Sequence, residues 1–297
     1  MYNNRVVLER VLPIEGKLDL RATLRPLHGV FRSDGWWFTD RTSAGPATLR
    51  VARGSDGVRG SGWGPGAEVL IERLAAIVGL EDDPAAFQTD HPVVAALHRR
   101  NMGARIGRTG RVFAELVAAI AAQKVTAAEA HRALRGLYRS FSEPAPGPGD
   151  GLLLPPDPER ISSAPYWSFH EIHLEQRRAD VLRRVASDAG KIDDLWSVAP
   201  ETAAARLAAY PGIGEWTIAE TLVRSHGDAD AVSVGDFHLK NSVVYHLTGR
   251  PRGTDEEMLE LLEGFRPHRA RVVRLLHQLG HAPKFGPRTT PRNITRY

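Results

Sequence analysis

Apolar and polar positions alternate along the first part of the chain. The segments with this pattern, each predicted to be a half-buried strand, are residues 18–24, 35–39 and 47–53. Turn-forming Gly, Ser and Pro residues separate them. After Gly64-Pro-Gly66, apolar residues recur at helical spacing up to Val78, which predicts a helix. Residues 1–88 are therefore expected to form a small antiparallel sheet with at least one helix.

From about residue 91 the spacing of apolar residues becomes helical. Thr126 with Glu129, and Thr254 with Glu257, have the spacing of capping boxes, which start helices. Residues 143–158 contain six prolines and predict a loop or linker, because proline continues neither a helix nor an inner strand. The predicted helices cover residues 112–120, 126–138, 175–189, 202–210, 216–225, 254–264 and 269–280.

Composition narrows the chemistry that the chain can perform. The 297 residues include no cysteine, which excludes disulfides, zinc–thiolate sites, iron–sulfur clusters and thiol nucleophiles. No apolar run approaches the ~20 residues of a membrane span, so we expect a cytoplasmic protein with no membrane partner. Residues 91–114 and 264–297 contain basic residues and no acid. Two such stretches favour a polyanionic partner over a merely solvated surface.

A short turn between two predicted helices is the first candidate site. The segment Tyr210-Pro-Gly-Ile-Gly-Glu-Trp-Thr217 ends one helix, turns sharply and begins the next. Its two glycines tolerate positive φ and let a ligand approach the backbone. The amides of Gly212, Gly214 and Trp216 would be free at a helix N-terminus, which suits a phosphate, while Ile213 would anchor the turn in the core. Taken alone, the segment also fits an ordinary helix–helix turn.

The second candidate site follows about twenty residues downstream. A short apolar run, residues 231–234, breaks at Gly235, and Asp236 then stands at the N-cap of a helix predicted over residues 237–243. Asp236 could be a cap alone. A carboxylate in this place can also serve as a catalyst, because capping fixes its geometry and keeps it ionised.

Together the two motifs resemble the helix-hairpin-helix (HhH-GPD) DNA glycosylase superfamily, and most closely its 3-methyladenine DNA glycosylase II (AlkA-like) branch. The resemblance covers about residues 105–280. It implies a mainly α protein with an α+β N-terminal part, in which a small antiparallel sheet domain precedes a two-lobed helical region. The implied boundaries are 1–88 for the sheet domain and 89–297 for the helical region, with lobes at about 113–230 and at 89–112 plus 231–297, and a cleft between them.

The resemblance implies a DNA repair enzyme that acts on damaged double-stranded DNA. Such an enzyme flips an alkylated purine, similar to 3-methyladenine, out of the duplex and excises it by hydrolysis, leaving an abasic site. Asp236 would stabilise the oxocarbenium-like transition state. Relatives with lyase activity carry a nucleophilic lysine at the position of Trp216, and tryptophan forms no Schiff base. The resemblance therefore implies a monofunctional glycosylase.

Further residues receive roles only from the resemblance. Glu220 and His277 stand where relatives often carry pocket aromatics. The residues implied for the substrate pocket are Trp216, Glu220, His277 and Gln278, and those implied for binding DNA phosphates are Gly212, Gly214, Trp216 and Thr217. Gln123 or Lys124 would fill the gap left by the extruded base. The backbone carbonyls of Ala208, Tyr210 and Ile213 would bind a monovalent cation, Na⁺ or K⁺.

Three other expectations complete the prediction. No cofactor is expected to be required, an iron–sulfur cluster is excluded by the absence of cysteine, and the protein is expected to act as a monomer associated with the bacterial nucleoid through DNA. The alternatives are a DNA-binding protein that keeps the hairpin without catalysis, a glycosylase for a different damaged base, and an unrelated helical enzyme in which Asp236 is only a cap.

Overall fold

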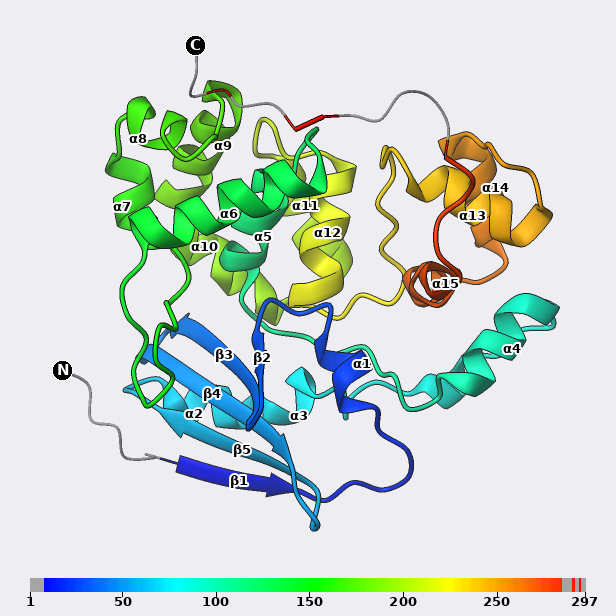
Figure 1. Cartoon of the computed structure of the whole chain (residues 1–297), viewed down its shortest axis with the longest axis horizontal. Helices are drawn as coiled ribbons and strands as arrows, with labels where there is room; N and C mark the ends of the chain where they lie inside the picture. Colours follow the sequence, from blue (N-terminus) through cyan, green and yellow to red (C-terminus); the bar gives the residue numbers. More distant parts are fainter. Residues whose placement is uncertain (1–7, 285–289, 292–293, 295–297) are drawn as a thin grey trace.

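The computed structural model describes residues 8–284, 290–291 and 294. Its N-terminal part contains a five-stranded antiparallel sheet with strand order β1-β5-β4-β3-β2. Figure 1 shows this sheet beneath the helical part of the molecule. The strand bounds are β1 Leu8–Leu12, β2 Val30–Arg32, β3 Gly35–Thr42, β4 Gly45–Arg53 and β5 Val58–Trp63.

Two of the three predicted strands are confirmed and one is wrong. The predictions over residues 35–39 and 47–53 correspond to β3 and β4, which pair with each other. The segment predicted as a strand over residues 18–24 instead contains a short helix, α1 (Leu20–Leu24). The side chain of Asp19 accepts a hydrogen bond from the Ala22 amide at 2.8 Å, so an N-cap outweighs a short alternating pattern.

Helices make up most of the remaining chain, and both predicted capping boxes are present. The predicted helix over residues 269–280 ends earlier, at Leu276, and a 3₁₀ turn follows it. The α-helix bounds are α2 Ala67–Glu72, α3 Leu74–Ile77, α4 Pro92–Arg100, α5 Val112–Ala121, α6 Ala127–Phe141, α7 Pro158–Ser163, α8 Tyr166–His170, α9 Gln176–Ser187, α10 Ala189–Asp193, α11 Pro200–Ala208, α12 Glu215–Ser225, α13 Leu239–Thr248, α14 Asp255–Glu263 and α15 Arg269–Leu276; the 3₁₀ turns are η1 Pro84–Ala86, η2 Asp194–Ser197 and η3 His277–Leu279.

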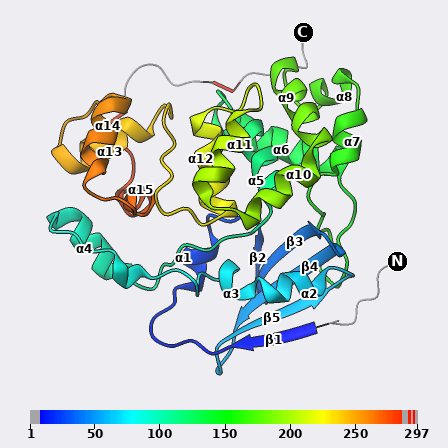
Figure 2. The ribbon, with the colours of Figure 1, turned by 180° about the vertical axis from the view of Figure 1, so that it is seen from behind.

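Helices α1 to α3 pack on the sheet, and the helices that follow them are divided between two further apolar cores. One core joins α5 to α12 and includes the fully buried Leu116, Leu137 and Phe169. The other joins α13, α14 and α15 to α4, a helix that lies far earlier in the sequence, through residues such as Val94 and Met258. Figures 1 and 2 show these two groups of helices side by side above the sheet. The mainly α fold with an α+β N-terminal part is confirmed.

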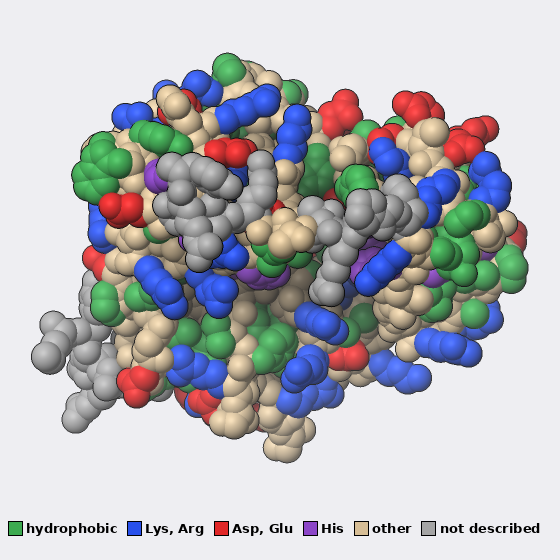
Figure 3. Space-filling view, turned by 45° about the horizontal axis from the view of Figure 1, so that its top comes forward, with side chains coloured by type: hydrophobic (Ala, Val, Ile, Leu, Met, Phe, Trp, Pro, Cys, Tyr) green, Lys and Arg blue, Asp and Glu red, His purple; other side chains and the backbone are tan. Residues whose placement is uncertain are grey.

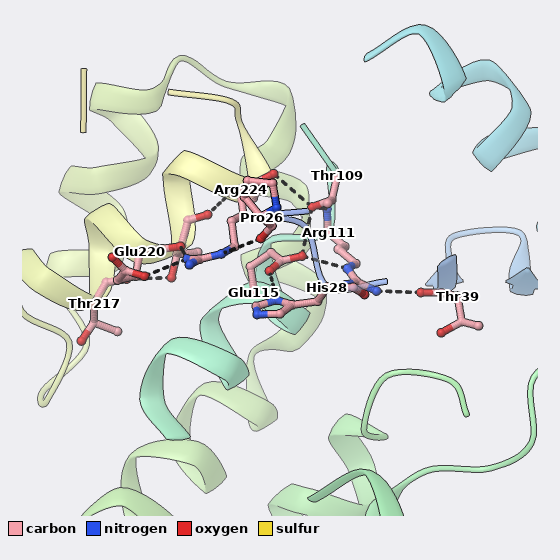
Figure 4. A network of polar contacts seen from close by, with 11 residues as sticks. Pro26, His28, Thr39, Thr109, Arg111, Glu115, Thr217, Glu220 and Arg224 are labelled. Atoms are coloured by element: carbon pink, nitrogen blue, oxygen red, sulfur yellow. Dashed lines mark hydrogen bonds and ion pairs between the residues drawn. The ribbon is translucent and has the colours of Figure 1, made fainter. Parts of the chain in front are cut away.

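A buried polar cluster joins the sheet to the helical part (Figure 4). Arg111 donates to Glu115 at 2.9 Å, to the Thr39 carbonyl at 2.7 Å and to the His28 carbonyl at 2.9 Å. His28 Nδ1 lies 2.5 Å from the second oxygen of Glu115. Although burial opposes ionisation, the charges of His28 and Arg111 hold the pKa of Glu115 well below its usual range. Arg111 and Glu115 therefore both stay ionised inside the fold.

No helix in the described part of the chain is long and apolar enough to cross a membrane. This finding agrees with the absence of a long apolar run in the sequence.

Asp193, at the end of α10, makes folding stability depend on pH. Burial raises its pKa to about 7, and the hydrogen bond from the Phe113 amide only partly opposes that rise. Because the folded pKa lies above the unfolded value, this group stabilises the fold at low pH, and that contribution is lost as the pH rises through 7.

We expect Asp193→Asn to be more stable than the wild type at pH 8, by roughly 1–3 kcal/mol, and to show a flatter pH dependence between pH 4 and 7. Urea unfolding at several pH values measures both effects. Asp194→Asn, which changes the exposed neighbour, is the control. Identical pH slopes for the wild type and Asp193→Asn would contradict the assignment.

Candidate active site

The hairpin between α11 and α12 has the predicted turn, but its two glycines have different reasons to be glycine. Gly212 has φ +94°, and a Cβ there would lie 2.5 Å from the Val181 side chain, so the fold itself requires glycine. Gly214 has φ −106°, and a Cβ there would meet no atom within 4 Å. The expectation of positive φ therefore holds only for Gly212, and the space above Gly214 is open.

Two contacts with the rest of the protein hold the hairpin in place. Ile213 is buried, as predicted, and Arg184 of α9 donates to the Pro211 carbonyl at 2.8 Å. The amides of Gly212, Gly214 and Trp216 have no backbone acceptor within the described residues. A rigid turn that leaves these N–H groups free at the start of an eleven-residue helix can bind an anion.

Asp236 follows Gly235 and uses both carboxylate oxygens. One oxygen accepts the amides of His238 and Leu239, at 2.8 and 2.9 Å. The other accepts the indole N–H of Trp216 at 3.1 Å. These two bonds resemble those of a cap, but the predicted N-cap position is wrong: α13 begins at Leu239, two residues later than expected, and its N-cap residue is His238. The two sequence motifs meet in one hydrogen bond.

The predicted pocket residues fall into two groups. Trp216, half-buried, and Glu220 lie one turn apart on α12, and the charges of Glu220 and Asp236 act on His277. Burial and His281 lower the pKa of His277, which favours a neutral imidazole. Gln278 instead lines a small cavity against α4. The structure brings the first three together around Asp236 and places Gln278 toward α4.

The loop between α5 and α6 separates the two candidates for the gap-filling residue. Gln123 donates to the Gly212 carbonyl and to the Thr217 hydroxyl, both at 2.9 Å, so its side chain ties this loop to the hairpin. Thr217 is itself buried, so the structure does not present the predicted phosphate-binding residue Thr217 at the surface. Lys124 has φ +52° and an exposed side chain at the tip of the loop. The loop therefore presents Lys124 outward.

The carbonyls proposed for a monovalent cation lie around the same hairpin. The Tyr210 carbonyl accepts the Ile213 amide at 3.0 Å, whereas the carbonyls of Ala208 and Ile213 accept no hydrogen bond from a described residue. Two carbonyls with free lone pairs are compatible with a cation ligand set. Within the described residues, no group of three or more His, Asp or Glu side chains could hold a metal.

Figure 3 shows the face that carries the hairpin and the α5–α6 loop. Lys and Arg side chains are spread over its middle and lower part, and acidic side chains gather at the edge over α13 and α14. The face is hollowed near its centre. A mainly basic face with a hollow suits a duplex with a polyanionic backbone. Of the basic stretch 264–297, Arg288, Arg292 and Arg296 lie outside the described residues.

Three residues at the site were missed by sequence reasoning. Ser233 donates to Glu220 at 2.5 Å, and Asp255 accepts the Gly235 amide at 3.0 Å. Phe237, next to Asp236, exposes 64% of its surface. The Thr254 capping box marked the start of α14, but nothing in the sequence indicated that its first residue reaches the loop before Asp236.

No protein-family model and no curated protein matches the chain. Solved structures do match it. A 3-methyladenine DNA glycosylase from Archaeoglobus fulgidus gives a TM-score of 0.72, covering 92% of this chain and 99% of its own, at 17% identity. MBOgg1 in complex with a low-affinity DNA ligand gives 0.67, with 93% and 96% covered at 17% identity.

A Clostridium acetobutylicum 8-oxoguanine glycosylase/lyase in complex with double-stranded DNA gives 0.64, with 87% and 90% covered at 14% identity. At such identities the similarity concerns the fold. The chain has the fold of these solved structures, as the resemblance of the two motifs implied.

The different surroundings of the two hairpin glycines give a test of the anion site. We expect Gly214→Arg to fold with wild-type stability and to lose at least about tenfold in affinity for duplex DNA, because its side chain would occupy the open space where a phosphate would lie. Gly212→Ala should instead destabilise the protein, by strain and contact with Val181. Fluorescence anisotropy at matched salt and urea unfolding measure the two effects. Unchanged affinity of Gly214→Arg would remove the phosphate role.

Proposed function

We propose that this protein is a monofunctional DNA repair glycosylase that excises an alkylated purine, similar to 3-methyladenine, from duplex DNA. The observation that carries the proposal is the hydrogen bond from the Trp216 indole to Asp236. It places a fixed carboxylate beside the free amides of the hairpin, so that a phosphate and a reacting sugar can be held together.

DNA binding and base extrusion use the hairpin and the α5–α6 loop. The hairpin amides hold one phosphate of the damaged strand. The glycosidic bond is enclosed in the duplex, so the damaged base must first rotate out, at a cost of a few kcal/mol. Lys124, at the tip of its loop, enters the space that the base leaves. A monovalent cation on the carbonyls of Ala208, Tyr210 and Ile213 would add positive charge near the same phosphate.

Asp236 carries the chemical step. As the bond between C1′ and the base nitrogen breaks, its electron pair leaves with the base and positive charge develops on the sugar. The Asp236 carboxylate stabilises that charge, and three hydrogen bonds hold it in place in advance. Water then adds to C1′ and loses its proton to solvent or to Asp236, which leaves an abasic site. A cationic alkylated purine departs as a neutral base and needs no proton donor.

Trp216 decides between hydrolysis and strand cleavage. A Schiff-base mechanism needs an amine where the second helix of the hairpin begins, and Trp216 supplies none. Its aromatic face suits a cationic base. Glu220 and His277 are polar, and hydrogen bonds to a neutral, oxidised base are therefore the second candidate specificity. We further propose that the protein acts as a monomer in the cytoplasm.

The role of Asp236 can be separated from DNA binding. We expect Asp236→Asn to lower the single-turnover rate of base release about 10²–10³-fold, because asparagine keeps an acceptor for the N–H groups of His238 and Leu239 but loses the charge. Affinity for DNA with an abasic-site analogue should stay within about twofold. Asp56→Asn, an exposed carboxylate on the sheet domain, is the control.

Product analysis tests the remaining parts of the proposal. Wild-type protein should release free 3-methyladenine or 7-methylguanine from alkylated duplex DNA and leave an uncleaved strand with an abasic site. Cleavage without added base would contradict the monofunctional mechanism. No release by the wild type, with binding intact, would favour the non-catalytic DNA-binding alternative.

The α5–α6 loop generates a further prediction. We expect Lys124→Ala to slow base extrusion about tenfold without loss of stability, because its side chain is exposed in the free protein. Gln123→Ala should weaken DNA binding instead, since it frees the hairpin. Stopped-flow fluorescence of 2-aminopurine beside the lesion reports extrusion. Equal extrusion rates for Lys124→Ala and wild type would exclude Lys124 as the gap filler.

A further inference from the structure

The loop that carries Asp236 is fastened by one carboxylate from each helical core. Glu220, on α12, accepts the hydroxyl of Ser233 at 2.5 Å. Asp255, the first residue of α14, accepts the amide of Gly235 at 3.0 Å. Residues 233–235 therefore lie between two acidic side chains that belong to different cores, and Asp236 follows them directly.

We propose that Glu220 and Asp255 are positioning residues for Asp236, which act by fixing the loop over residues 233–235 between the two cores. This inference rests on the proposed function, because it assigns their task to the same reaction. Each oxygen of Glu220 and of Asp255 already accepts a hydrogen bond within the protein.

The loop needs this support at Gly235, because packing fixes only its earlier part, where Val232 and Val234 lie against the second core. Gly235 has φ +84°, and a Cβ there would meet no atom within 4 Å. Inside the loop only two backbone bonds form, from Val234 to Val232 at 2.9 Å and from Asp236 to Ser233 at 3.2 Å. An open turn around a glycine has many accessible conformations. The two carboxylates restrict it to one.

Glu220 is linked to the sheet domain through Arg224 (Figure 4). Arg224, one turn along α12, donates to the second oxygen of Glu220 at 2.9 Å and to the Pro26 carbonyl at 3.2 Å. The Thr109 amide in turn donates to the Arg224 carbonyl at 2.9 Å. The carboxylate that receives Ser233 thus has a fixed orientation before any DNA binds.

Asp255 is held from the opposite side. The Thr254 capping box fixes the first turn of α14. The second oxygen of Asp255 accepts Lys240 at 2.9 Å, and Lys240 is the second residue of α13, the helix that follows Asp236. Asp255 therefore fastens both the residue before Asp236 and the helix after it. A shift of about 1 Å in a catalytic group can cost on the order of 10²-fold in rate.

The test compares disruptive and conservative changes at both ends of this arrangement. Ser233→Ala and Asp255→Ala should lower the single-turnover rate of base release about 10–100-fold and leave affinity for abasic-analogue DNA within about twofold, because the hairpin is untouched. Ser233→Thr keeps the hydroxyl and Asp255→Asn keeps an acceptor, so both should recover most of the rate.

A second readout needs no substrate. The Trp216 indole N–H, assigned by its loss in Trp216→Phe, reports where Asp236 lies through its ¹H–¹⁵N resonance. This resonance should move in Ser233→Ala and Asp255→Ala and return in the conservative variants. Glu260→Gln is the matched control: it removes an exposed carboxylate from the same helix without touching the loop or the capping box, so it should leave both the rate and the resonance unchanged.

The outcomes separate this inference from the proposed function. Wild-type rate and an unshifted Trp216 resonance in the alanine variants would overturn the positioning role, even if the wild type releases base. If Glu260→Gln reproduces the Asp255→Ala effect, the loss of negative charge on α14 accounts for it and the role is likewise overturned. A wild type that releases no base would overturn the proposed function, while the resonance would still decide whether the carboxylates place Asp236.

Discussion

The buried ion pair between Arg111 and Glu115 is the interaction on which the arrangement of the domains depends. Both side chains are almost fully buried, at 3% and 1% exposure. A buried pair stabilises a fold only where further hydrogen bonds satisfy its remaining polar atoms, and removing one partner typically costs about 3–5 kcal/mol. Here the carbonyls of Thr39 and His28 accept the spare guanidinium hydrogens. Those two acceptors belong to the sheet domain, so the pair can be satisfied only when the sheet is docked.

From this pair, polar contacts continue to the candidate catalytic loop. The hydroxyl of Thr109 lies 3.3 Å from Glu115 and from the Arg224 carbonyl, and Arg224 holds Glu220, which receives Ser233. The sheet domain, for which the sequence indicated no role, is therefore part of the support of the site. The sheet domain contacts the helices through hydrogen bonds of charged groups as well as through apolar surface. Because such hydrogen bonds are directional, they determine how the sheet is oriented on the helices as well as how tightly it binds them.

Local signals in the sequence predicted local structure well. The two capping boxes, the helix of residues 126–138 and the hairpin each depend on residues within four positions of one another, and the structure has all of them. The error at residues 18–24 has the same origin: a pattern of seven residues is too short to outweigh the Asp19 cap. Sequence periodicity decides between helix and strand only where it extends over several turns.

Contacts between segments that are far apart in the sequence could not be predicted from such local signals. The sequence predicts Gln123 as one of two possible gap-filling residues, but the residues that accept its hydrogen bonds lie 89 and 94 positions away. Asp255 reaches Gly235 across 20 positions, and Gln278 turns toward α4, which lies far earlier in the chain. Each of these outcomes depends on how α5, α12, α14 and α4 pack, and the alternation of apolar and polar residues carries no information on that packing. The sequence motif predicted a type of site, whereas the tertiary structure determines which of its side chains are held by other residues and which are exposed.

Trp216 joins both halves of the proposed chemistry in one residue. Its aromatic ring occupies the position where a lyase would carry an amine, and its indole N–H holds the carboxylate that hydrolysis needs. A lysine at position 216 would lie beside Asp236, whose negative charge would favour the protonated, non-nucleophilic form of the amine. Lyase chemistry at this site would therefore require more than a nucleophile: the carboxylate would have to move, or DNA would have to screen it. The amides of His238 and Leu239 and the loop before Asp236 oppose such movement, so in the proposed mechanism these contacts would favour hydrolysis over the lyase reaction.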